Sequence, residues 1–190
     1  MAIIISNGFS ITPIAVPISV SATLVFDLDA ANYSAVPTNG TTVAGTGAYT
    51  ITTSNTYASL AWNSANGGVF RKSSAINNFN DMFYGGPNYS SGTQAYTVFM
   101  AYKWDGVTGG RLLNANSASP DFLMGLWASS GTTRMNIAFN GLRLFGKFAT
   151  SISSSDPVSG DVAFVKVYNG ALTLADIQTL HAAYKSRVGY

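Results

Sequence analysis

The chain has 190 residues, enough for one domain, and only 9% of them are charged, against roughly 25% in an average soluble domain. A formal net charge of +2, carried by scattered basic residues, argues against nucleic-acid binding, and the lack of cysteine excludes a disulfide framework. Every acidic residue is aspartate, while Thr, Tyr, Phe and Val are plentiful, which favours strands over helices. With so few charged residues, either neutral polar side chains keep the protein in solution or partners cover much of its surface, and we favour the second alternative.

Residues 1–21 are predicted to form an N-terminal apolar arm. Pro13 and Pro17 forbid a helix and limit sheet pairing to an edge. Two alternatives stay open: a first strand on the domain's own sheet, or an extended arm that docks on a neighbouring subunit. The segment lacks the basic start of a signal peptide, and no segment is apolar for the roughly 18 to 20 residues of a membrane span, so we expect synthesis in a cytoplasm and no membrane partner. The candidate partner-binding residues of the arm are Ile3, Ile4, Ile5, Phe9 and Ile11.

Beyond the arm, residues 22–190 are predicted to form one domain without repeats or linkers. Alternating apolar and polar residues, interrupted by Gly, Ser, Asn and Pro, predict nine or ten short strands. This spacing is typical of an all-β, two-sheet antiparallel jelly-roll sandwich. The clearest predicted strands are residues 24–29, 57–62, 69–71 after an Asn66-Gly67-Gly68 turn, 95–104, 111–115, 122–128, 134–140, 142–148 and one near Phe164.

The end of the chain predicts a strand, a turn and one helix. Ala163, Val165 and Val167 share an apolar strand face that should meet the core, and Asn169-Gly170 suits a tight turn. A helix is predicted over residues 173–187, with Thr173 as N-cap and Asp176 completing a capping box. Its apolar stripe at helical spacing consists of Leu174, Ile177, Leu180 and Tyr184.

Two segments carry a resemblance to a known family. LVFDLDAANYSAVPTNGTT (24–42) resembles the opening of laminin-G-like, concanavalin A-like jelly-roll modules, and VKVYNGALTLADIQTLHAAYKSRVG (165–189) is similar to their closing strand, turn and helix. The chain departs from the family pattern at residues 43–47 (VAGTG), where many such modules carry a Trp, Asp and Ser-Gly cluster. The resemblance implies a jelly-roll fold of the kind found in tailed-bacteriophage virion proteins, such as capsid decoration, tail or fibre components, and in carbohydrate-binding domains of larger secreted proteins.

Candidate catalytic residues are few. The chain has no Glu, which the related glycosidases usually use, and Asp27 and Asp29 are expected to end a strand and cap the next turn rather than to act as a carboxylate pair. His181, the single histidine, is expected on the helix surface, and one His without Cys argues against zinc. Asp and Asn are plentiful for calcium, but no EF-hand-like spacing occurs, so we expect no cofactor. We expect no enzymatic activity.

A loop-like run from Asn77 to Tyr89 carries the aromatic and amide chemistry of a sugar site, with Asp81, Tyr84, Asn88 and Tyr89 as candidate glycan-binding residues. Its aromatic residues could instead pack under the loop or contact another subunit. The sequence therefore predicts a non-enzymatic phage virion structural protein, a capsid decoration or other particle-surface component. Its expected partners are capsid or tail proteins of the same particle and further copies of itself, as a dimer or trimer. The alternative is a lectin-like adhesion module that recognises host surface glycans.

Overall fold

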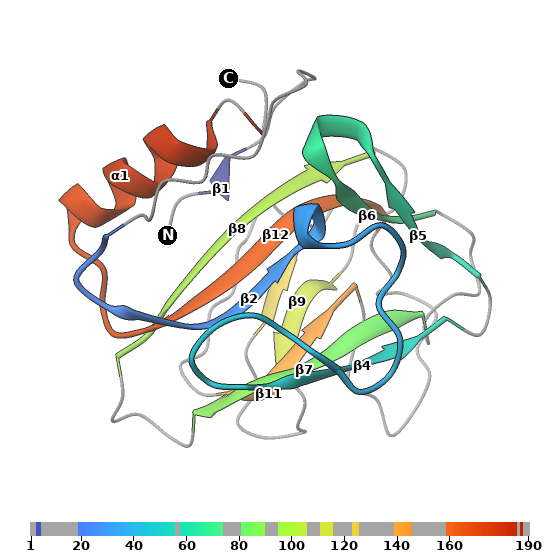
Figure 1. Ribbon diagram of the computed structural model, residues 1–190, viewed down its shortest axis with the longest axis horizontal. Helices are drawn as coiled ribbons and strands as arrows, with labels where there is room; N and C mark the ends of the chain where they lie inside the picture. The colour runs from blue at the N-terminus through green and yellow to red at the C-terminus, as the bar shows by residue number, and fades with distance from the viewer. Residues whose placement is uncertain are drawn as a thin grey trace.

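A computed structural model describes residues 3–4, 19–55, 58–73, 81–89, 95–105, 111–115, 123–125, 139–145, 159–185 and 187, and within them it contains twelve strands and one α-helix. The strands form two six-stranded sheets, here called sheet A and sheet B, and the helix lies at the end of the chain (Figure 1). All-β architecture with one C-terminal helix is thereby confirmed for the described residues, whereas jelly-roll connectivity stays a prediction.

Sheet A is built around its longest strand, β12. One edge of β12 pairs with β8 along its length, and the other edge pairs first with β6 and then with β2. All pairs in sheet A are antiparallel except β1 with β8. The strands of sheet A are β1 (Ile3–Ile4), β2 (Thr23–Asp29), β5 (Leu60–Asn63), β6 (Val69–Lys72), β8 (Thr97–Trp104) and β12 (Gly160–Asn169).

Sheet B is antiparallel throughout, in the order β10-β9-β11-β7-β4-β3. Its strands are β3 (Thr41–Thr42), β4 (Thr50–Ser54), β7 (Met82–Tyr89), β9 (Arg111–Ala115), β10 (Leu123–Gly125) and β11 (Phe139–Leu144). One strand, β11, runs through Asn140-Gly141, where the sequence predicted a break between two strands. The ladder shifts register at this point, which is how a Gly-containing segment stays in a sheet as a bulge.

The main core fills the space between the two sheets. Sheet A contributes Phe26, Leu28, Phe70 and Val165, and sheet B contributes side chains such as Phe83, all of which are buried. Three of the aromatic rings in this core lie within contact distance of one another, Phe70 with Phe83 at 5.0 Å and Phe83 with Phe145 at 6.5 Å between centroids. Burial of such side chains, at about 1.5 to 3 kcal/mol each, is the main force that holds the sheets together.

A second, smaller core lies on the other face of sheet A, under helix α1 (Leu174–Tyr184). Leu180 is fully buried there, and the ring of Tyr184 lies 4.8 Å from the ring of Phe164 on β12. Both faces of β12 are therefore covered, whereas the alternation in the sequence predicts burial of one face only. The predicted stripe is wrong at its first position, because Leu174 is 71% exposed.

The predicted turns and caps are confirmed where they are described. Asn66 and Gly67 both have positive φ in the connection between β5 and β6, as a tight hairpin requires. Gly170, after β12, also has positive φ, and a Cβ there would lie 2.9 Å from the Cβ of Ala22. Thr173 and Asp176 form the predicted capping box of α1. Within the described part of the chain, no helix has the length and apolar character needed to cross a membrane.

Candidate functional site

The N-terminal residues lie on the edge of sheet A. The backbone of Ile3–Ile4 pairs in parallel with β8, with Ile3 opposite Met100 and Ile4 opposite Ala101. This pairing corresponds to the first of the two alternatives for the arm, a strand on the domain's own sheet. It covers two of the eight residues of β8. Ile5, Phe9 and Ile11 lie outside the described residues.

Ser21, where the arm meets the domain, is held by hydrogen bonds to the first turn of α1. The backbone N–H and the hydroxyl of Ser21 both donate to the carboxylate of Asp176, at 3.1 and 2.5 Å. The same carboxylate accepts from the backbone N–H and hydroxyl of Thr173. These hydrogen bonds lower the pKa of Asp176 from 3.8 to about 2, with the Ser21 hydroxyl as the largest cause. Ser21 is therefore held beside the first turn of α1, and Val20 packs against the second core.

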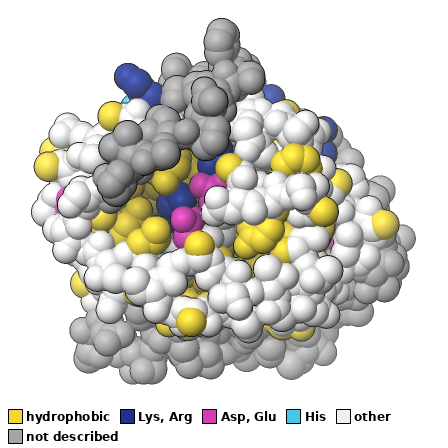
Figure 2. All heavy atoms as spheres, in the orientation of Figure 1, with side chains coloured by type: hydrophobic (Ala, Val, Ile, Leu, Met, Phe, Trp, Pro, Cys, Tyr) yellow, Lys and Arg dark blue, Asp and Glu magenta, His cyan; other side chains and the backbone are white. Residues whose placement is uncertain are grey.

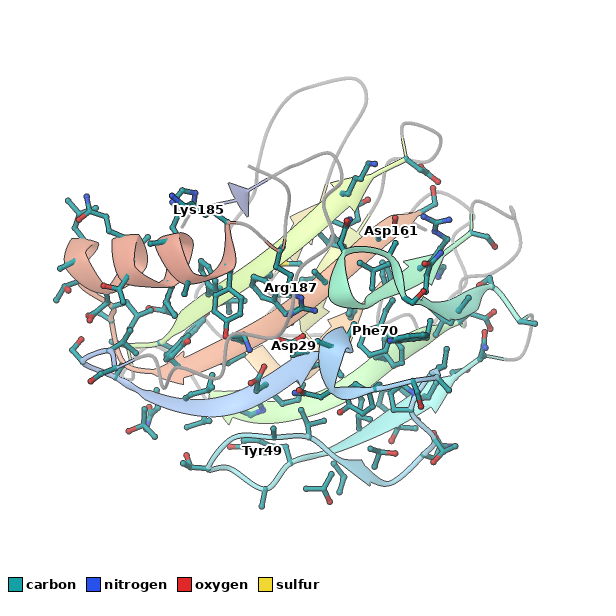
Figure 3. All side chains as sticks on the ribbon, turned by 45° about the horizontal axis from the view of Figure 1, so that its top comes forward. Asp29, Tyr49, Phe70, Asp161, Lys185 and Arg187 are labelled. Carbon is teal, nitrogen blue, oxygen red and sulfur yellow. The ribbon has the colours of Figure 1, made fainter. Side chains whose placement is uncertain are left out.

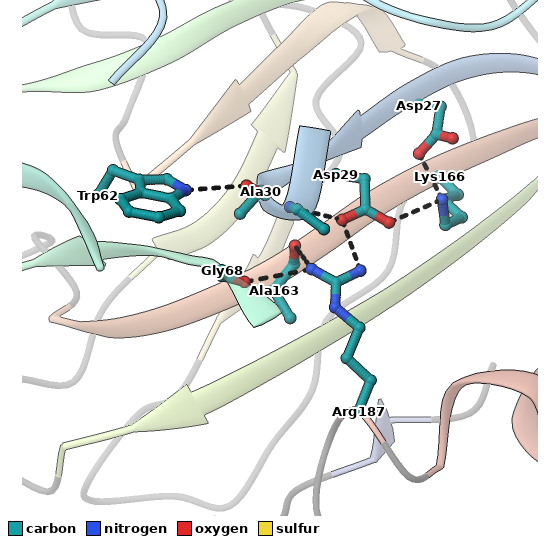
Figure 4. A network of polar contacts seen from close by, with 9 residues as sticks. Asp27, Asp29, Ala30, Trp62, Gly68, Ala163, Lys166 and Arg187 are labelled. Carbon is teal, nitrogen blue, oxygen red and sulfur yellow. Dashed lines mark hydrogen bonds and ion pairs between the residues drawn. The ribbon is translucent and has the colours of Figure 1, made fainter. Parts of the chain in front are cut away.

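Four charged side chains form a cluster between β2, β12 and the C-terminal tail, which we call the clasp: Asp27, Asp29, Lys166 and Arg187 (Figure 4). The ammonium of Lys166 lies 2.5 Å from Asp27 Oδ1 and 3.2 Å from Asp29 Oδ2. The guanidinium of Arg187 lies 2.5 Å from Asp29 Oδ1 and donates to the carbonyls of Gly68 and Ala163. Arg187, in the tail after α1, thereby contacts β2, β12 and the turn that precedes β6.

The clasp is almost entirely buried. Only 2% of the Lys166 side chain is exposed, and its ammonium lies 5.0 Å from the centre of the Tyr184 ring and 5.5 Å from that of Phe164. Burial favours the neutral amine, but the carboxylates of Asp27 and Asp29 outweigh it and raise the pKa of Lys166. Burial also raises the pKa of Asp27, against the opposing effect of Lys166. A buried lysine held between two carboxylates is a structural arrangement, since a buried ammonium needs a carboxylate beside it to stay charged.

Asp27 and Asp29 thus share a strand face, as their spacing predicts, and both are bound by cations. Asp29 also caps the 3-10 turn Ala30–Asn32 by accepting from the backbone N–H of Ala31, which confirms the capping interpretation for this residue. The contact of Arg187 with Asp29 is not predicted by the sequence. A signal for the clasp was present, however, because Lys166 lies within an otherwise apolar strand and such a lysine needs acidic partners.

The clasp lies over the middle of sheet A, where Lys166 is opposite Asp27 on β2 and Phe99 on β8. In Figure 3, Arg187 and Asp29 lie next to each other, whereas Lys185 lies at the end of α1, away from them. On the face drawn in Figure 2, acidic and basic atoms meet at the bottom of a hollow with hydrophobic side chains beside them. Lys185 is exposed, so it provides a matched control for Arg187.

The predicted loop is wrong for Tyr84, Asn88 and Tyr89, because Met82–Tyr89 is strand β7. Asp81, directly before the strand, is fully buried, and its carboxylate accepts from the backbone N–H and hydroxyl of Ser59. Tyr84 is half-buried, and it follows Phe83, which faces the core, so the alternation of the strand puts Tyr84 on the outer face of sheet B. Asn88 and Tyr89 pair with β11 through their backbones. Asp81 and Tyr84 therefore do not form one surface site.

His181 lies on α1 and is half-buried, and its backbone carbonyl accepts a hydrogen bond from the backbone N–H of Lys185. Among the described residues, no group of three or more His, Cys, Asp or Glu side chains is placed to hold a metal ion. Comparison with family models, with curated proteins and with solved structures gives no match to this chain. The resemblance to laminin-G-like modules accordingly stays a prediction from the two sequence segments.

Proposed function

We propose that this protein is a non-enzymatic structural component of a tailed-phage virion, which attaches to the particle surface through its N-terminal arm. The observation that carries the proposal is the way in which the arm contacts the domain. Two residues near its start pair through their backbones with an edge strand, and Ser21 at its end is hydrogen-bonded to Asp176. A capsid decoration protein or another surface component would use such an arm to reach the lattice or a sister subunit.

The contact between β1 and β8 is small enough to be exchanged. Two residue pairs provide a few backbone hydrogen bonds, each with a net contribution of about 1 kcal/mol. Burying a single isoleucine side chain on a neighbour contributes about 1.5 to 3 kcal/mol. The arm offers several such residues, so docking on a partner can outweigh release from β8. Strand addition at the edge of a sheet is an established way for an extended segment to bind.

The remainder of the domain supports a rigid, non-catalytic role. Both carboxylates of the clasp are bound by cations, and Asp81 is buried against Ser59. The low content of charge suits a surface that is partly covered in an assembly. Several contacts at once would strengthen attachment by avidity, which is the reason to expect a dimer or trimer.

The test is to express the full chain and a variant lacking residues 2–18 during infection and to measure how much of each co-sediments with purified particles. The deletion keeps Ser21 and its contacts with Asp176, so the domain should fold normally. We expect loss of particle association. A second variant, Ile4→Pro, removes a backbone donor without shortening the chain, and Ile4→Val is its matched control. Normal co-sedimentation of the truncated, folded protein would contradict the proposal.

The alternative proposal, a lectin-like module that binds host glycans, has less geometric support. Asp81 is not at the surface, and Tyr84 is the one candidate with a described side chain on an outer face. A glycan array decides between the two: saturable binding that Tyr84→Ala abolishes would favour the lectin-like function.

A further inference from the structure

A polar cleft lies at the end of sheet A where β12 begins and where β6 and β8 end. Its volume is about 490 Å³, and sites for small molecules commonly have volumes of about 300 to 1,000 Å³. The described side chains that line it are polar or charged, among them Arg71, Ser73, Lys103, Asp105 and Asp161. None of them belongs to the clasp, and Figure 3 shows Asp161 well away from helix α1.

Three charged side chains form a row across the cleft. In the ladder of sheet A, Asp161 on β12 is opposite Arg71 on β6 and Lys103 on β8. Opposed residues of neighbouring strands project from the same face, and two strand spacings put about 10 Å between the backbones of Arg71 and Lys103. Val162, the next residue of β12, faces the main core, so the row lies on the outer face of the sheet.

Asp161 holds the guanidinium of Arg71 in one orientation. Nε of Arg71 donates to Asp161 Oδ1 at 2.6 Å, and Nη2 donates to Oδ2 at 2.7 Å. These hydrogen bonds raise the pKa of Arg71, so the group stays charged. A guanidinium has five N–H groups, and the bonds to Asp161 leave three, two on Nη1 and one on Nη2. Because 51% of the Arg71 side chain is exposed, a ligand can reach them.

Lys103 provides a second cation, whereas the carboxylates near it already have partners. The side chain of Lys103 is exposed and takes part in no ion pair or hydrogen bond within the part of the chain that the structure describes. Asp161 is paired with Arg71, and Asp105 accepts from the hydroxyl of Ser159 at 2.7 Å. The cleft therefore offers N–H donors from two cations, which is complementary to an anion.

An inorganic anion would fill only a small part of the cleft, since a water molecule takes up about 30 Å³. The hydroxyl of Ser73 lines the remainder, together with the carboxylate of Asp161, which has four lone-pair sites and uses two for Arg71. Hydroxyl groups of a ligand can donate to and accept from such side chains. Among the described lining residues no aromatic or aliphatic side chain offers an apolar contact.

Lys72 also lines the cleft, but the proposed contacts do not include it. The residue is 1% exposed, and its Nζ donates to the backbone carbonyls of Asp81 and Phe145. The ligand contacts are therefore assigned to the outer face of the sheet alone.

We propose that the cleft binds an acidic sugar, whose carboxylate lies between Arg71 and Lys103 and whose hydroxyls bond to Ser73 and Asp161. Nη1 and Nη2 of Arg71 supply two parallel N–H donors, which match the two oxygens of a carboxylate, and Lys103 supplies a second charge. The site includes no residue of the arm, so it goes beyond the proposed attachment to a particle and does not depend on it.

Titration of the isotope-labelled full-length chain with sodium glucuronate, followed by NMR, tests the proposal directly. We expect saturable shifts in the amide signals of residues 71–73, 103–105 and 159–161. Glucose, which has the same ring without the carboxylate, should give none, and inorganic phosphate, which lacks the sugar hydroxyls, should bind about 10-fold more weakly. No shift with glucuronate would overturn the proposal, and phosphate binding as tight as that of glucuronate would overturn the assignment to a sugar.

Substitutions separate a binding site from a row of surface ion pairs. Lys103→Gln removes a charge that has no described side-chain contact, so the fold should be unchanged while the affinity for glucuronate falls by about 10-fold or more. Arg71→Lys keeps the charge but loses the parallel donors, and it should also weaken binding. Lys185→Gln, at an exposed lysine on the C-cap of α1, is the matched control and should leave the affinity unchanged. Equal affinities of the wild type and Lys103→Gln would overturn the proposal.

Salt and the arm deletion distinguish this site from attachment through the arm. Raising NaCl from about 0.1 to 1 M should weaken glucuronate binding, because salt screens exposed charges. The variant lacking residues 2–18 should bind glucuronate as the full chain does, even where it no longer associates with particles. Loss of glucuronate binding in that folded variant would place the ligand on the arm and overturn the assignment to the cleft.

Discussion

Arg187 is the residue through which the tail after α1 is tied to sheet A. It is the only described partner of Asp29 on the tail, and 13% of its side chain is exposed. Replacing Arg187 by Ala removes this ion pair and the hydrogen bonds to Gly68 and Ala163. Because Asp29 keeps Lys166, we expect a loss of about 2 to 3 kcal/mol in the free energy of unfolding, at the low end for a broken buried pair.

Thermal unfolding measures this effect as a fall in Tm of roughly 5 to 10 °C. The matched control is Lys185→Ala, which removes an exposed charge two residues away and should change stability by less than about 0.5 kcal/mol. Equal effects of the two substitutions would show that the clasp does not stabilise the tail.

Individual contacts of the clasp could not be read from the sequence, although the strands that carry it could. The alternation in residues 24–29 and 162–168 predicted both strands correctly. The contact between Lys166 and Asp27, however, spans 139 positions, and no local pattern reports which strands pair. The same holds for Asp81, whose partner Ser59 lies 22 positions earlier.

Helix α1 shows how far local rules reach at the scale of an element. Its N-cap and capping box followed from Thr173 and Asp176 alone, because these hydrogen bonds form within four residues. Its hydrophobic contacts did not, since Leu174 fits the helical period but is exposed. The additional bond from Ser21 to Asp176 spans 155 positions and has no local signal.

Asp176 makes this helix start sensitive to acid. Its pKa is lowered from 3.8 to about 2 in the folded protein, so its stabilising contribution is fully present above about pH 4 and is lost as the pH falls toward 2. We expect the difference in unfolding free energy between the wild type and Asp176→Asn to shrink over this interval. Urea unfolding at several pH values measures it, with Gln178→Ala on the same helix as control. A difference that stays constant from pH 5 to pH 2 would contradict the assignment.

Strand faces were harder to predict than the strands themselves. The ladder between β12 and β2 shifts register between Val167 and Tyr168, so Leu24 packs under the helix while Phe26 and Leu28 face the main core. A one-residue shift exchanges the two faces, and no alternation pattern shows where it occurs. Likewise, Gly85, Gly86 and Asn88, which made their segment resemble a loop, are accommodated in β7.

At the scale of the whole molecule, the sequence predicted an all-β fold with one C-terminal helix, and the described residues agree. The two family-like segments, 24–42 and 165–189, come together in space, because β2 pairs with β12 and Arg187 contacts Asp29. The domain is therefore closed by contacts between its two ends. The start of the arm contacts the domain through the pairing of Ile3 and Ile4 with β8, and attachment to a particle is proposed to depend on the arm.

The composition of the arm makes a final prediction about that attachment. Residues 1–20 contain no charged side chain, so their docking should rest on apolar burial and backbone pairing. Salt screens charge but strengthens apolar association slightly, so raising NaCl from about 0.1 to 1 M should leave particle binding unchanged or tighter. Cooling should weaken it, because hydrophobic stabilisation falls at low temperature. Co-sedimentation with purified particles across a salt and temperature series measures both effects, with the 2–18 deletion as baseline. Release of the bound protein by 1 M salt would show that charged residues of the domain, and not the arm, hold it to the particle.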